Sequence, residues 1–379
     1  MVAVLFDLTR SFSRRDHANP TGIDRVETAL FNALSQLGPV TGLARSGRRC
    51  WSADGALIGA SILQPAPLDR IARLQYWRDE ARRRGESGLR ATYGRGARDL
   101  PFPTHAGQWL VCVGHTLPDE AQVARWKARG GRLAVLVHDL IPLDHPEWSR
   151  PRPAARFATT MRLTAEHADL VLHLTRAGQA RWLNHYSRNE GQRHAVLPMG
   201  ATDLPDMERN PRPRPVMLMI GTIEPRKGHA TILDIWDQFA PVADLHIVGR
   251  RGWRNAETFA RLDARPPGVT EIGEATDLQI AAEISAAHTL LFPSRAEGYG
   301  LPVMEARARG LPVLASNLPE LREIHGDAIG YVAPNTSDAW HLAIDGRLKE
   351  NHPSTDQSKV LWSPWIESAR MLRALMFGG

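Results

Sequence analysis

Two glutamates eight positions apart could serve one ligand, because Glu297 lies just before a predicted helix and Glu305 lies in its opening turns. Gly298 and Gly300 let the backbone approach a ligand closely, since glycine tolerates conformations that a Cβ forbids. Pro302 suits the first turn of a helix, whose free N–H groups and partial positive charge attract phosphate. Carboxylates accept hydrogen bonds from sugar hydroxyls. The turn therefore predicts a ligand with both phosphate and sugar, unless the glutamates are solvated or balance the helix dipole.

A basic pair follows a second apolar run. Val216–Ile220 suits a buried parallel strand, and the turn after it contains Arg226 beside Lys227. A guanidinium is a planar fork and an ammonium is a point charge, so the pair can grip a diphosphate. The chain has only four lysines, which makes this one less incidental. The alternative is a solvated basic turn.

The stretch from Pro293 to Glu305 resembles the E-x7-E signature of retaining GT-B glycosyltransferases, the large family called glycosyl transferases group 1 and often numbered GT4. That resemblance implies an α/β fold of the GT-B type, with two Rossmann-like, doubly wound domains facing across a cleft. It also implies that Glu297 orients the transferred sugar and that Glu305 holds the ribose. Arg226 and Lys227 would neutralise the departing diphosphate. Neither a cofactor nor a metal is then required, and the sequence has no Asp-x-Asp arrangement that argues for one.

The same resemblance implies further contacts to the donor, a nucleoside-diphosphate sugar. They fall on the glutamate-flanked turn, on the ends of two strands and on the first helix of the chain: Gly298, Tyr299, Gly300, Leu301, Gly221, Thr222, Gly249 and Gly22. Arg25, close to Gly22, either adds charge near the phosphates or lies on an exposed helix face. Asn317–Glu320 resembles the family's turn after a later strand and is as consistent with a helix cap as with a ligand contact.

A histidine candidate follows the predicted strand 133–137. Ligands of open α/β sheets bind beyond the carboxyl ends of the strands, which places His138 well for a site. The string from Leu136 to Pro142 is similar to the His-Asp-Leu-x-Pro of many polysaccharide enzymes of this family, including O-antigen mannosyltransferases. The similarity implies that His138 approaches the donor sugar. A purely structural histidine is the alternative, and His115 is a second candidate.

The elements that must position these residues alternate between strand and helix. In the first half we predict strands at 2–8, 109–113, 133–137, 170–174 and 195–197, with helices at 22–37, 156–167 and 178–184. In the second half we predict strands at 216–221, 244–249, 269–272, 288–292, 312–315 and 330–333, separated by helices. This alternation predicts parallel sheets with crossover helices.

The domain boundaries follow from composition. A stretch rich in Pro and Arg at 205–215 has the character of a linker. We predict an acceptor-binding domain at 1–199, a donor-binding domain at 200–362 and a segment at 363–379 whose helix crosses back to the first domain. A chain of 379 residues with 43% hydrophobic content supports two well-formed cores.

Composition also bounds the location of the protein. The apolar runs are far shorter than the roughly twenty residues that span a bilayer, and the first residues lack the features of a signal peptide. Cys50 and Cys112 cannot form a disulfide framework. We therefore expect a cytoplasmic protein.

The net charge of +6 suits an anionic partner. Arginines crowd residues 70–98, where apolar positions at 68–81 recur at helical spacing. Such a basic amphipathic helix is either a solvated cover of the core or a peripheral contact with anionic lipid at the inner face of the membrane. A third reading is nucleic acid, but no recognised reader motif accompanies the charges, so no nucleic-acid partner is expected.

Together these features predict a retaining, metal-independent glycosyltransferase of surface polysaccharide synthesis. It would move a hexose or deoxyhexose, with GDP-mannose as the first candidate donor, to a glycan or a lipid-linked oligosaccharide. The alternatives are another GT-B enzyme, such as a nucleotide-sugar epimerase or a phosphorylase, a nucleic-acid-binding protein, and an inactive scaffold.

Overall fold

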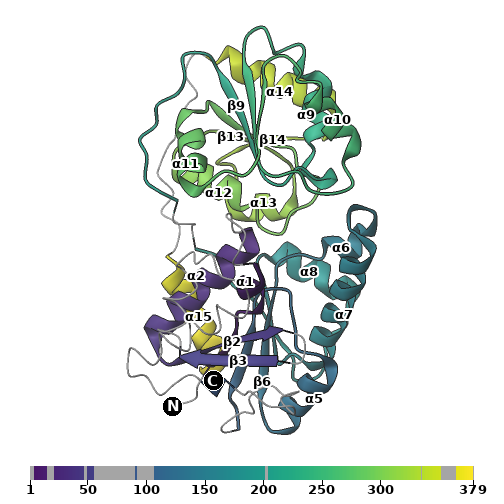
Figure 1. The fold of residues 1–379 in the computed structure, drawn as a ribbon, viewed down its shortest axis with the longest axis vertical. Helices are drawn as coiled ribbons and strands as arrows, with labels where there is room; N and C mark the ends of the chain where they lie inside the picture. The colour runs from purple at the N-terminus through teal and green to yellow at the C-terminus, as the bar shows by residue number, and fades with distance from the viewer. Residues whose placement is uncertain are drawn as a thin grey trace.

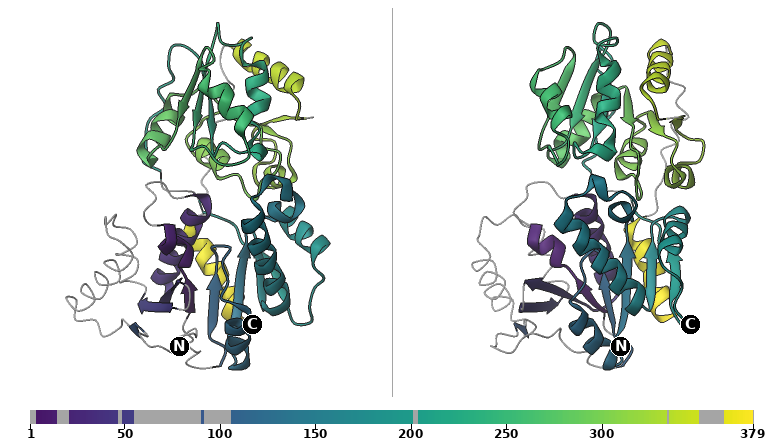
Figure 2. Two further views of the ribbon diagram at one scale, coloured as in Figure 1. Left: turned by 45° about the vertical axis from the view of Figure 1, so that its right-hand side comes forward. Right: turned by 90° about the vertical axis from the view of Figure 1, so that its right-hand side faces the viewer.

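The protein forms two α/β domains that lie one above the other along its long axis (Figure 1). The computed structural model describes residues 4–14, 21–46, 49–54, 90–91, 106–200, 204–333, 335–350 and 364–378. The lower domain in Figure 1 contains the described residues up to 200 together with the C-terminal helix, and the upper domain contains 204–350. The two further views show the same division (Figure 2).

An eight-stranded sheet of order β4-β3-β2-β1-β5-β6-β7-β8 forms the centre of the described part of the first domain. β1 lies between β2 and β5 and is parallel to both. The bounds of its strands are β1 (Val4–Asp7), β2 (Val40–Ser46), β3 (Arg49–Asp54), β4 (Arg90–Ala91), β5 (Trp109–Cys112), β6 (Arg132–Val137), β7 (Leu170–His173) and β8 (Arg193–Val196).

Helices cover both faces of this sheet, because its strands are apolar on both sides. In β5, Trp109 and Val111 face one apolar cluster and Leu110 and Cys112 face the other. The first cluster includes α2 and α15, and the second includes α5, α7 and α8. The bounds are α1 (Thr9–Arg14), α2 (Gly22–Leu37), α5 (Glu120–Ala128), α6 (Ile141–Asp144), η1 (Pro146–Trp148), α7 (Pro151–His167), α8 (Arg176–His185) and α15 (Trp365–Phe377).

The second domain has a parallel six-stranded sheet of order β11-β10-β9-β12-β13-β14. Its strands are β9 (Val216–Ile220), β10 (Asp244–Val248), β11 (Val269–Ile272), β12 (Thr289–Phe292), β13 (Val313–Ser316) and β14 (Gly330–Val332). α11, α12 and α13 pack on one face, and α9, α10 and α14 pack on the other. Its helices are η2 (Pro225–Lys227), α9 (His229–Trp236), α10 (Ala256–Asp263), α11 (Asp277–Ala286), α12 (Leu301–Ala308), α13 (Pro319–His325) and α14 (Ser337–Lys349).

The structure confirms the predicted α/β class with two doubly wound domains, and it corrects the first sheet. That sheet is not wholly parallel, because β3 runs antiparallel to β2 and to β4. The sequence prediction missed β2 and β3, and in β2 the alternation of apolar residues is interrupted by Gly42 and Arg45. α7 also begins at Pro151, five residues before the predicted start, because proline is well tolerated in the first turn of a helix.

The proline-rich stretch between the domains is attached to the second domain. Arg209 donates to the carbonyl oxygens of Ile284 and Ser285 at 2.5 and 3.1 Å. The N–H of Arg212 donates to Ala286 O at 3.1 Å, and Leu204 lies in the apolar core of that domain. From residue 204 onward, this stretch is therefore bound along the C-terminal end of α11.

The last helix, α15, packs beside α2 in the first domain (Figure 1). Ala369, Leu372 and Met376 are buried in the cluster that α2 forms with the sheet. The Trp109 indole donates to Met376 O at 3.1 Å, and the Ser368 hydroxyl donates to Pro198 O at 2.6 Å. The C-terminal segment is therefore part of the first domain's core.

Leu372→Ala is expected to lower the free energy of unfolding by about 3 kcal/mol, because it leaves a cavity between α15 and α2 where the side chain is fully buried. Urea unfolding followed by circular dichroism measures the loss. Leu342→Ala on α14 is the matched control, since that leucine is 70% exposed and should change stability by less than about 0.5 kcal/mol. Equal losses for the two variants would contradict the packing of α15.

No helix among the described residues is long and apolar enough to cross a membrane. The arginine-rich segment at 68–98 lies outside the described residues except for Arg90 and Ala91, so its predicted helix stays a prediction.

Candidate active site

The predicted site residues lie where strand order reverses in the second sheet. β9 and β12 are neighbours, but β10 follows β9 on one side and β13 follows β12 on the other. Crossover helices leave a neighbouring pair of such strands in opposite directions, which opens a crevice beyond their carboxyl ends. Arg226 and Lys227 follow β9 in η2, and Glu297 follows β12. Arg295 N–H donates to Arg226 O at 2.7 Å and ties the two turns together.

Glu297 is the centre of a buried charge cluster. Its Oε1 is 2.5 Å from Lys227 Nζ and 3.1 Å from Arg226 Nη1. Arg226 Nε is also 2.6 Å from Oε1 of the buried Glu224. The sequence placed both basic residues and Glu297 in one site, but gave no sign that they contact one another directly.

Burial disfavours the charged forms of Glu297 and Lys227, but their opposite charges offset this effect. Burial would raise the pKa of Glu297, yet Lys227 and Arg226 hold it below its ordinary value. Burial lowers the pKa of Lys227, and Arg226 adds to this while Glu297 opposes it. The carboxylate of Glu297 is therefore ionised at neutral pH and held between two cations.

Two glycines let the neighbouring strand ends approach. A Cβ at Gly249 would lie 2.0 Å from the carbonyl oxygen of Gly221, and both residues have positive φ. Only glycine fits such a backbone contact. Thr222, next to Gly221, lies against Gly252 in the same turn region. The structure thus brings Gly221, Thr222 and Gly249 together beside η2.

The turn after β12 faces the first domain across the domain interface. A Cβ at Gly298 would lie only 2.2 Å from the carbonyl oxygen of His138. Gly300 takes the left-handed conformation that starts α12, and Pro302 occupies its first turn. The nearest neighbour of Gly22 is Leu301, at 3.0 Å from a Cβ built on the glycine. Residues 298–301 therefore lie against the first domain, opposite the start of α2 and the end of β6.

The side chains of two predicted ligand residues are buried. Tyr299 packs in the apolar cluster of the first domain, and burial raises its pKa to about 12. The predicted donor contact of this residue would therefore have to come from its backbone. Glu305 is 7% exposed on α12. Its predicted contact with a ribose stays a prediction.

His138 is held as a neutral ring by its neighbours. Its Nε2 is 2.7 Å from Val113 O and must donate the proton, since a carbonyl oxygen only accepts. Its backbone N–H donates to His115 Nε2 at 2.9 Å. Burial, with a smaller contribution from His115, lowers the pKa of His138 to about 3. His115 has a positive φ of 55°, so the turn at the end of β5 is strained to make this contact.

The ring of His138 is expected to remain unprotonated between pH 8 and 5, and its NMR resonances should not move in that range. The urea-unfolded protein should titrate near about pH 6.5. Since only the unfolded chain binds this proton between pH 6.5 and 3, the residue makes the free energy of unfolding fall as pH is lowered through that window. Comparison with His138→Gln assigns the resonance. A midpoint between pH 6 and 7 in the folded protein would contradict the buried, neutral ring.

The acidic side chain of Asp24 lies at the start of α2, where the sequence predicted a phosphate contact. Asp24 accepts hydrogen bonds from Thr21 N–H at 2.7 Å, and from Arg10 and Arg14 at 2.7 and 2.9 Å. Arg25 does not lie on an exposed face, since its side chain is 14% exposed, and a role near the phosphates stays a prediction. It pairs with Asp277 at the start of α11 in the second domain, with Nη1 3.1 Å from Oδ2. A phosphate contact at Gly22 stays a prediction.

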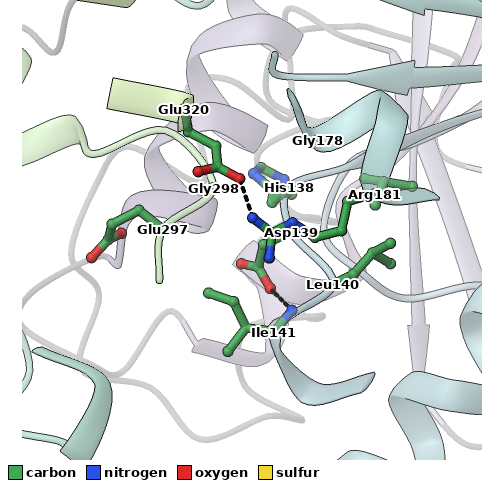
Figure 3. Close-up of a pocket in the computed structure, with 10 residues that line it drawn as sticks. His138, Asp139, Leu140, Ile141, Gly178, Arg181, Glu297, Gly298 and Glu320 are labelled. Atoms are coloured by element: carbon green, nitrogen blue, oxygen red, sulfur yellow. Dashed lines mark hydrogen bonds and ion pairs between the residues drawn. The ribbon is translucent and has the colours of Figure 1, made fainter. Parts of the chain in front are cut away.

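His138, Glu297 and Gly298 of the predicted site line a pocket between the domains, together with residues that the sequence did not place there (Figure 3). Asp139 and Arg181 line it from the first domain, and Glu320 lines it from the second. Arg181 Nη2 donates to Glu320 Oε1 at 2.6 Å. Glu320 belongs to the Asn317–Glu320 turn, which the sequence left open between a helix cap and a ligand contact. Leu318 is the N-cap residue of α13, and Glu320 faces Arg181. No local pattern distinguishes Arg181 from the chain's many other arginines.

The fold and the charge cluster define a protein of the GT-B class, and comparison with known proteins agrees. Residues 202–359 match the family model for glycosyl transferases group 1. The crystal structure of Anabaena Alr3699/HepE in complex with UDP-glucose covers 100% of this chain and 96% of its own, with a TM-score of 0.60 at 14% identity. That likeness confirms the GT-B fold.

Several curated relatives carry the name mannosyltransferase, among them the following two. Serotype-specific mannosyltransferase WbdA of Escherichia coli is 27% identical over 378 residues, which are 90% of this chain and 44% of that protein. O-antigen chain mannosyltransferase B of Escherichia coli is 37% identical over 142 residues, which are 35% of this chain and 37% of that protein. The chain thus spans less than half the length of these relatives.

Proposed function

We propose that the protein is a retaining glycosyltransferase that moves a hexose, with mannose from GDP-mannose as the first candidate, to a growing surface glycan. The observation that carries the proposal is the meeting of Arg226, Lys227 and Glu297 beyond the carboxyl ends of β9 and β12, opposite His138. The names of the two mannosyltransferase relatives support mannose and an O-antigen type of acceptor.

The two cations would act on the leaving group. As the bond between the anomeric carbon and the diphosphate oxygen breaks, negative charge grows on the diphosphate. Arg226 and Lys227 would stabilise that charge in a site shielded from water, where fixed charges act strongly. A diphosphate would share the cations with Glu297 and Glu224, which frees the Glu297 carboxylate to accept hydroxyls of the transferred sugar.

The remaining steps need no further charged group. The acceptor hydroxyl oxygen would bond to the anomeric carbon on the face that the diphosphate leaves, and its proton would pass to a diphosphate oxygen. His138, with its Nε2 proton bound by Val113, would offer only Nδ1 as an acceptor for a sugar hydroxyl. Contact between Gly298 and His138 would exclude water, whose attack on the donor is the competing reaction.

Glu305 would hold the ribose, and the backbone of 298–301 with Gly221, Thr222 and Gly249 would line the donor site. The acceptor would lie on the first domain, as a glycan or a lipid-linked oligosaccharide. Attachment of the arginine-rich segment to anionic lipid on the cytoplasmic side would suit a lipid-linked acceptor.

Turnover by the purified protein in EDTA tests the proposal. The donors are GDP-mannose, UDP-glucose, UDP-galactose and dTDP-rhamnose, each offered with octyl glycosides of mannose, glucose, galactose and N-acetylglucosamine. Proton NMR is expected to show a new glycoside with the anomeric configuration of the donor.

Each of the remaining outcomes would contradict one part of the proposal. An inverted product contradicts retention, and activity only with added divalent metal contradicts metal independence. Epimerised donor, or turnover that depends on free phosphate, would assign the protein to another GT-B activity. Absence of turnover with all sixteen pairs would indicate a scaffold, or a donor and acceptor outside this panel. Failure to bind GDP, UDP, dTDP and ADP alike would then favour the scaffold.

A further inference from the structure

Two neighbouring residues of the second domain, Trp253 and Arg254, contact the first domain at η1. The Trp253 indole N–H donates to the carbonyl oxygen of Trp148 at 2.7 Å, and Arg254 Nη1 donates to that of Glu147 at 2.6 Å. In Figure 1, α6, which leads into η1, lies at the end of the first domain that faces the second. These two hydrogen bonds therefore join successive carbonyl groups of η1 to the other domain.

Arg254 makes this contact from a backbone conformation that few side chains adopt. Its φ is 52°, in the left-handed region that favours glycine. Such residues persist only where the surrounding structure holds them, and they gather at functional sites. Arg150 of the first domain covers the ring of Trp253, with its guanidinium carbon 5.8 Å from the ring centre. The contact is thus kept at a cost in backbone strain, which indicates a role beyond covering the surface.

The turn at residues 250–254, which we call the clasp, is bonded to the turn that carries the two cations. Ile223 N–H donates to Arg250 O at 3.0 Å, and Gly252 N–H donates back to Ile223 O at 3.1 Å. A Cβ at Gly252 would lie 2.8 Å from the side chain of the residue before Ile223, so the two turns are in close contact. Ile223 is fully buried and lies three residues before Arg226. Movement of one turn therefore moves the other.

The segment that the clasp holds in the first domain follows His138 closely. At the start of α6, Ile141 N–H donates to Asp139 Oδ1 at 3.1 Å. His145 N–H donates to the carbonyl oxygen of Ile141 at 2.8 Å, and Trp148 N–H donates to that of His145 at 3.1 Å. These bonds connect the stretch into consecutive helical turns. A shift of η1 therefore shifts the turn that carries His138.

We propose that the clasp couples the diphosphate site of the second domain to the position of His138 in the first, and that Trp253 is a positioning residue for sugar transfer. The inference rests on the proposed function, which assigns the diphosphate to Arg226 and Lys227. A bound diphosphate orders the turn of these cations, and the clasp extends that order to η1 and the His138 turn. The first domain is then held against the donor sugar, and water is excluded from it.

Trp253→Phe tests the clasp, because it keeps an aromatic ring and removes the N–H that donates to Trp148 O. Hydrogen–deuterium exchange of the backbone amides of Trp148 and Ser149 measures how often η1 opens. Without nucleotide, exchange is expected to be about fivefold faster in the variant, the effect of one lost hydrogen bond. GDP, UDP, dTDP and ADP are then added in turn. The one that binds should slow this exchange about fivefold in the wild-type protein and less than about twofold in the variant.

The same variant should separate sugar transfer from hydrolysis of the donor. It is assayed with the donor and octyl glycoside that the wild-type protein uses fastest in the panel above. We expect kcat for transfer to fall about fivefold, and the ratio of hydrolysed to transferred sugar to rise about tenfold, because a loosened first domain admits water. If Trp253 served stability alone, both rates would fall with the folded fraction and their ratio would not change.

Arg251→Gln is the matched control within the clasp. The Arg251 side chain pairs with Glu271 at 2.7 and 2.8 Å and with Asp263 at 2.7 Å, and both acids belong to the second domain. The substitution therefore changes a long side chain of the same turn but leaves the bonds to η1 in place. Exchange at Trp148, kcat for transfer and the ratio of hydrolysis to transfer should all stay at their wild-type values.

The outcomes distinguish failure of the clasp from failure of the proposed function. Unchanged exchange of η1 in Trp253→Phe, or an equal acceleration in Arg251→Gln, would overturn the clasp while leaving glycosyl transfer intact. An unchanged ratio of hydrolysis to transfer, or full protection by nucleotide in Trp253→Phe, would overturn the coupling. Wild-type protein that neither binds a nucleotide nor turns over would overturn the proposed function, and the coupling with it. The exchange difference without nucleotide would remain in that case.

Discussion

Lys227→Met is expected to lower kcat by about 10²- to 10³-fold, the loss seen when one preorganised stabilising group is removed from a transition state. The substitution removes the ammonium 2.5 Å from Glu297 and leaves Arg226 as the remaining cation beside that carboxylate. Breaking a buried ion pair from one side also destabilises a protein by about 3–5 kcal/mol. Initial rates and urea unfolding, measured on the same samples, separate the two effects.

A double variant separates the loss of activity from the loss of stability. Lys227→Met/Glu297→Gln removes both partners, so its stability should fall by less than the sum of the single variants, because no unpaired charge is left. Its activity should stay as low as that of either single variant. Lys127→Met is the control, since that lysine pairs with Asp169 at 2.5 Å on the half-exposed surface of the first domain. It should cost less than about 1 kcal/mol and leave kcat unchanged. Wild-type kcat in Lys227→Met would remove the lysine from the mechanism.

Gly298→Ala is expected to lower kcat by about a hundredfold, because the added Cβ meets the carbonyl oxygen of His138 at 2.2 Å. The contact is between backbones of the two domains, so no flexible side chain can move aside. The domains must separate or the loop must shift. Binding of the nucleoside diphosphate should survive, since Arg226 and Lys227 belong wholly to the second domain. Small-angle scattering should report a larger radius of gyration for the variant.

Gly346→Ala controls for the substitution itself. A Cβ at Gly346, in α14, meets nothing within 4 Å, and alanine stabilises a helix interior by about 0.5–1 kcal/mol over glycine. This variant should keep wild-type kcat and scattering. If Gly298→Ala behaved in the same way, the close contact of the two domains at His138 would not be needed for turnover.

The strands with continuous apolar runs were predictable from the sequence, and the edge of the first sheet was not. Val216–Ile220 has no polar residue to interrupt it and forms β9 over those residues. β2 mixes Thr41, Gly42 and Arg45 with its apolar residues, so no local period identifies it. β2 becomes a strand because it pairs with β1. A pairing between segments that are distant in the sequence gives little sign in the residues of either segment.

The positions of Arg226, Lys227 and Glu297 after neighbouring strands were predictable because each lies in a turn with its own chemistry, whereas contacts between the domains were not. Arg25 and Asp277 are 252 positions apart, and Arg181 and Glu320 are 139 apart. Each of these residues alone is an ordinary charged position on a helix. The side chain of Tyr299 shows the same limit, because its burial in the first domain depends on how the two domains meet.

The central claim is that Arg226 and Lys227 form a diphosphate site, and thermal unfolding with nucleotides tests it most directly. GDP, UDP, dTDP and ADP, each in EDTA, are added to the wild-type protein and to Arg226→Ala/Lys227→Ala. A ligand that binds only the folded state raises Tm by mass action. We predict that one nucleoside diphosphate, with GDP first, raises the Tm of the wild-type protein and leaves that of the double variant unchanged. No shift with any of the four, or an equal shift in the double variant, would contradict the claim.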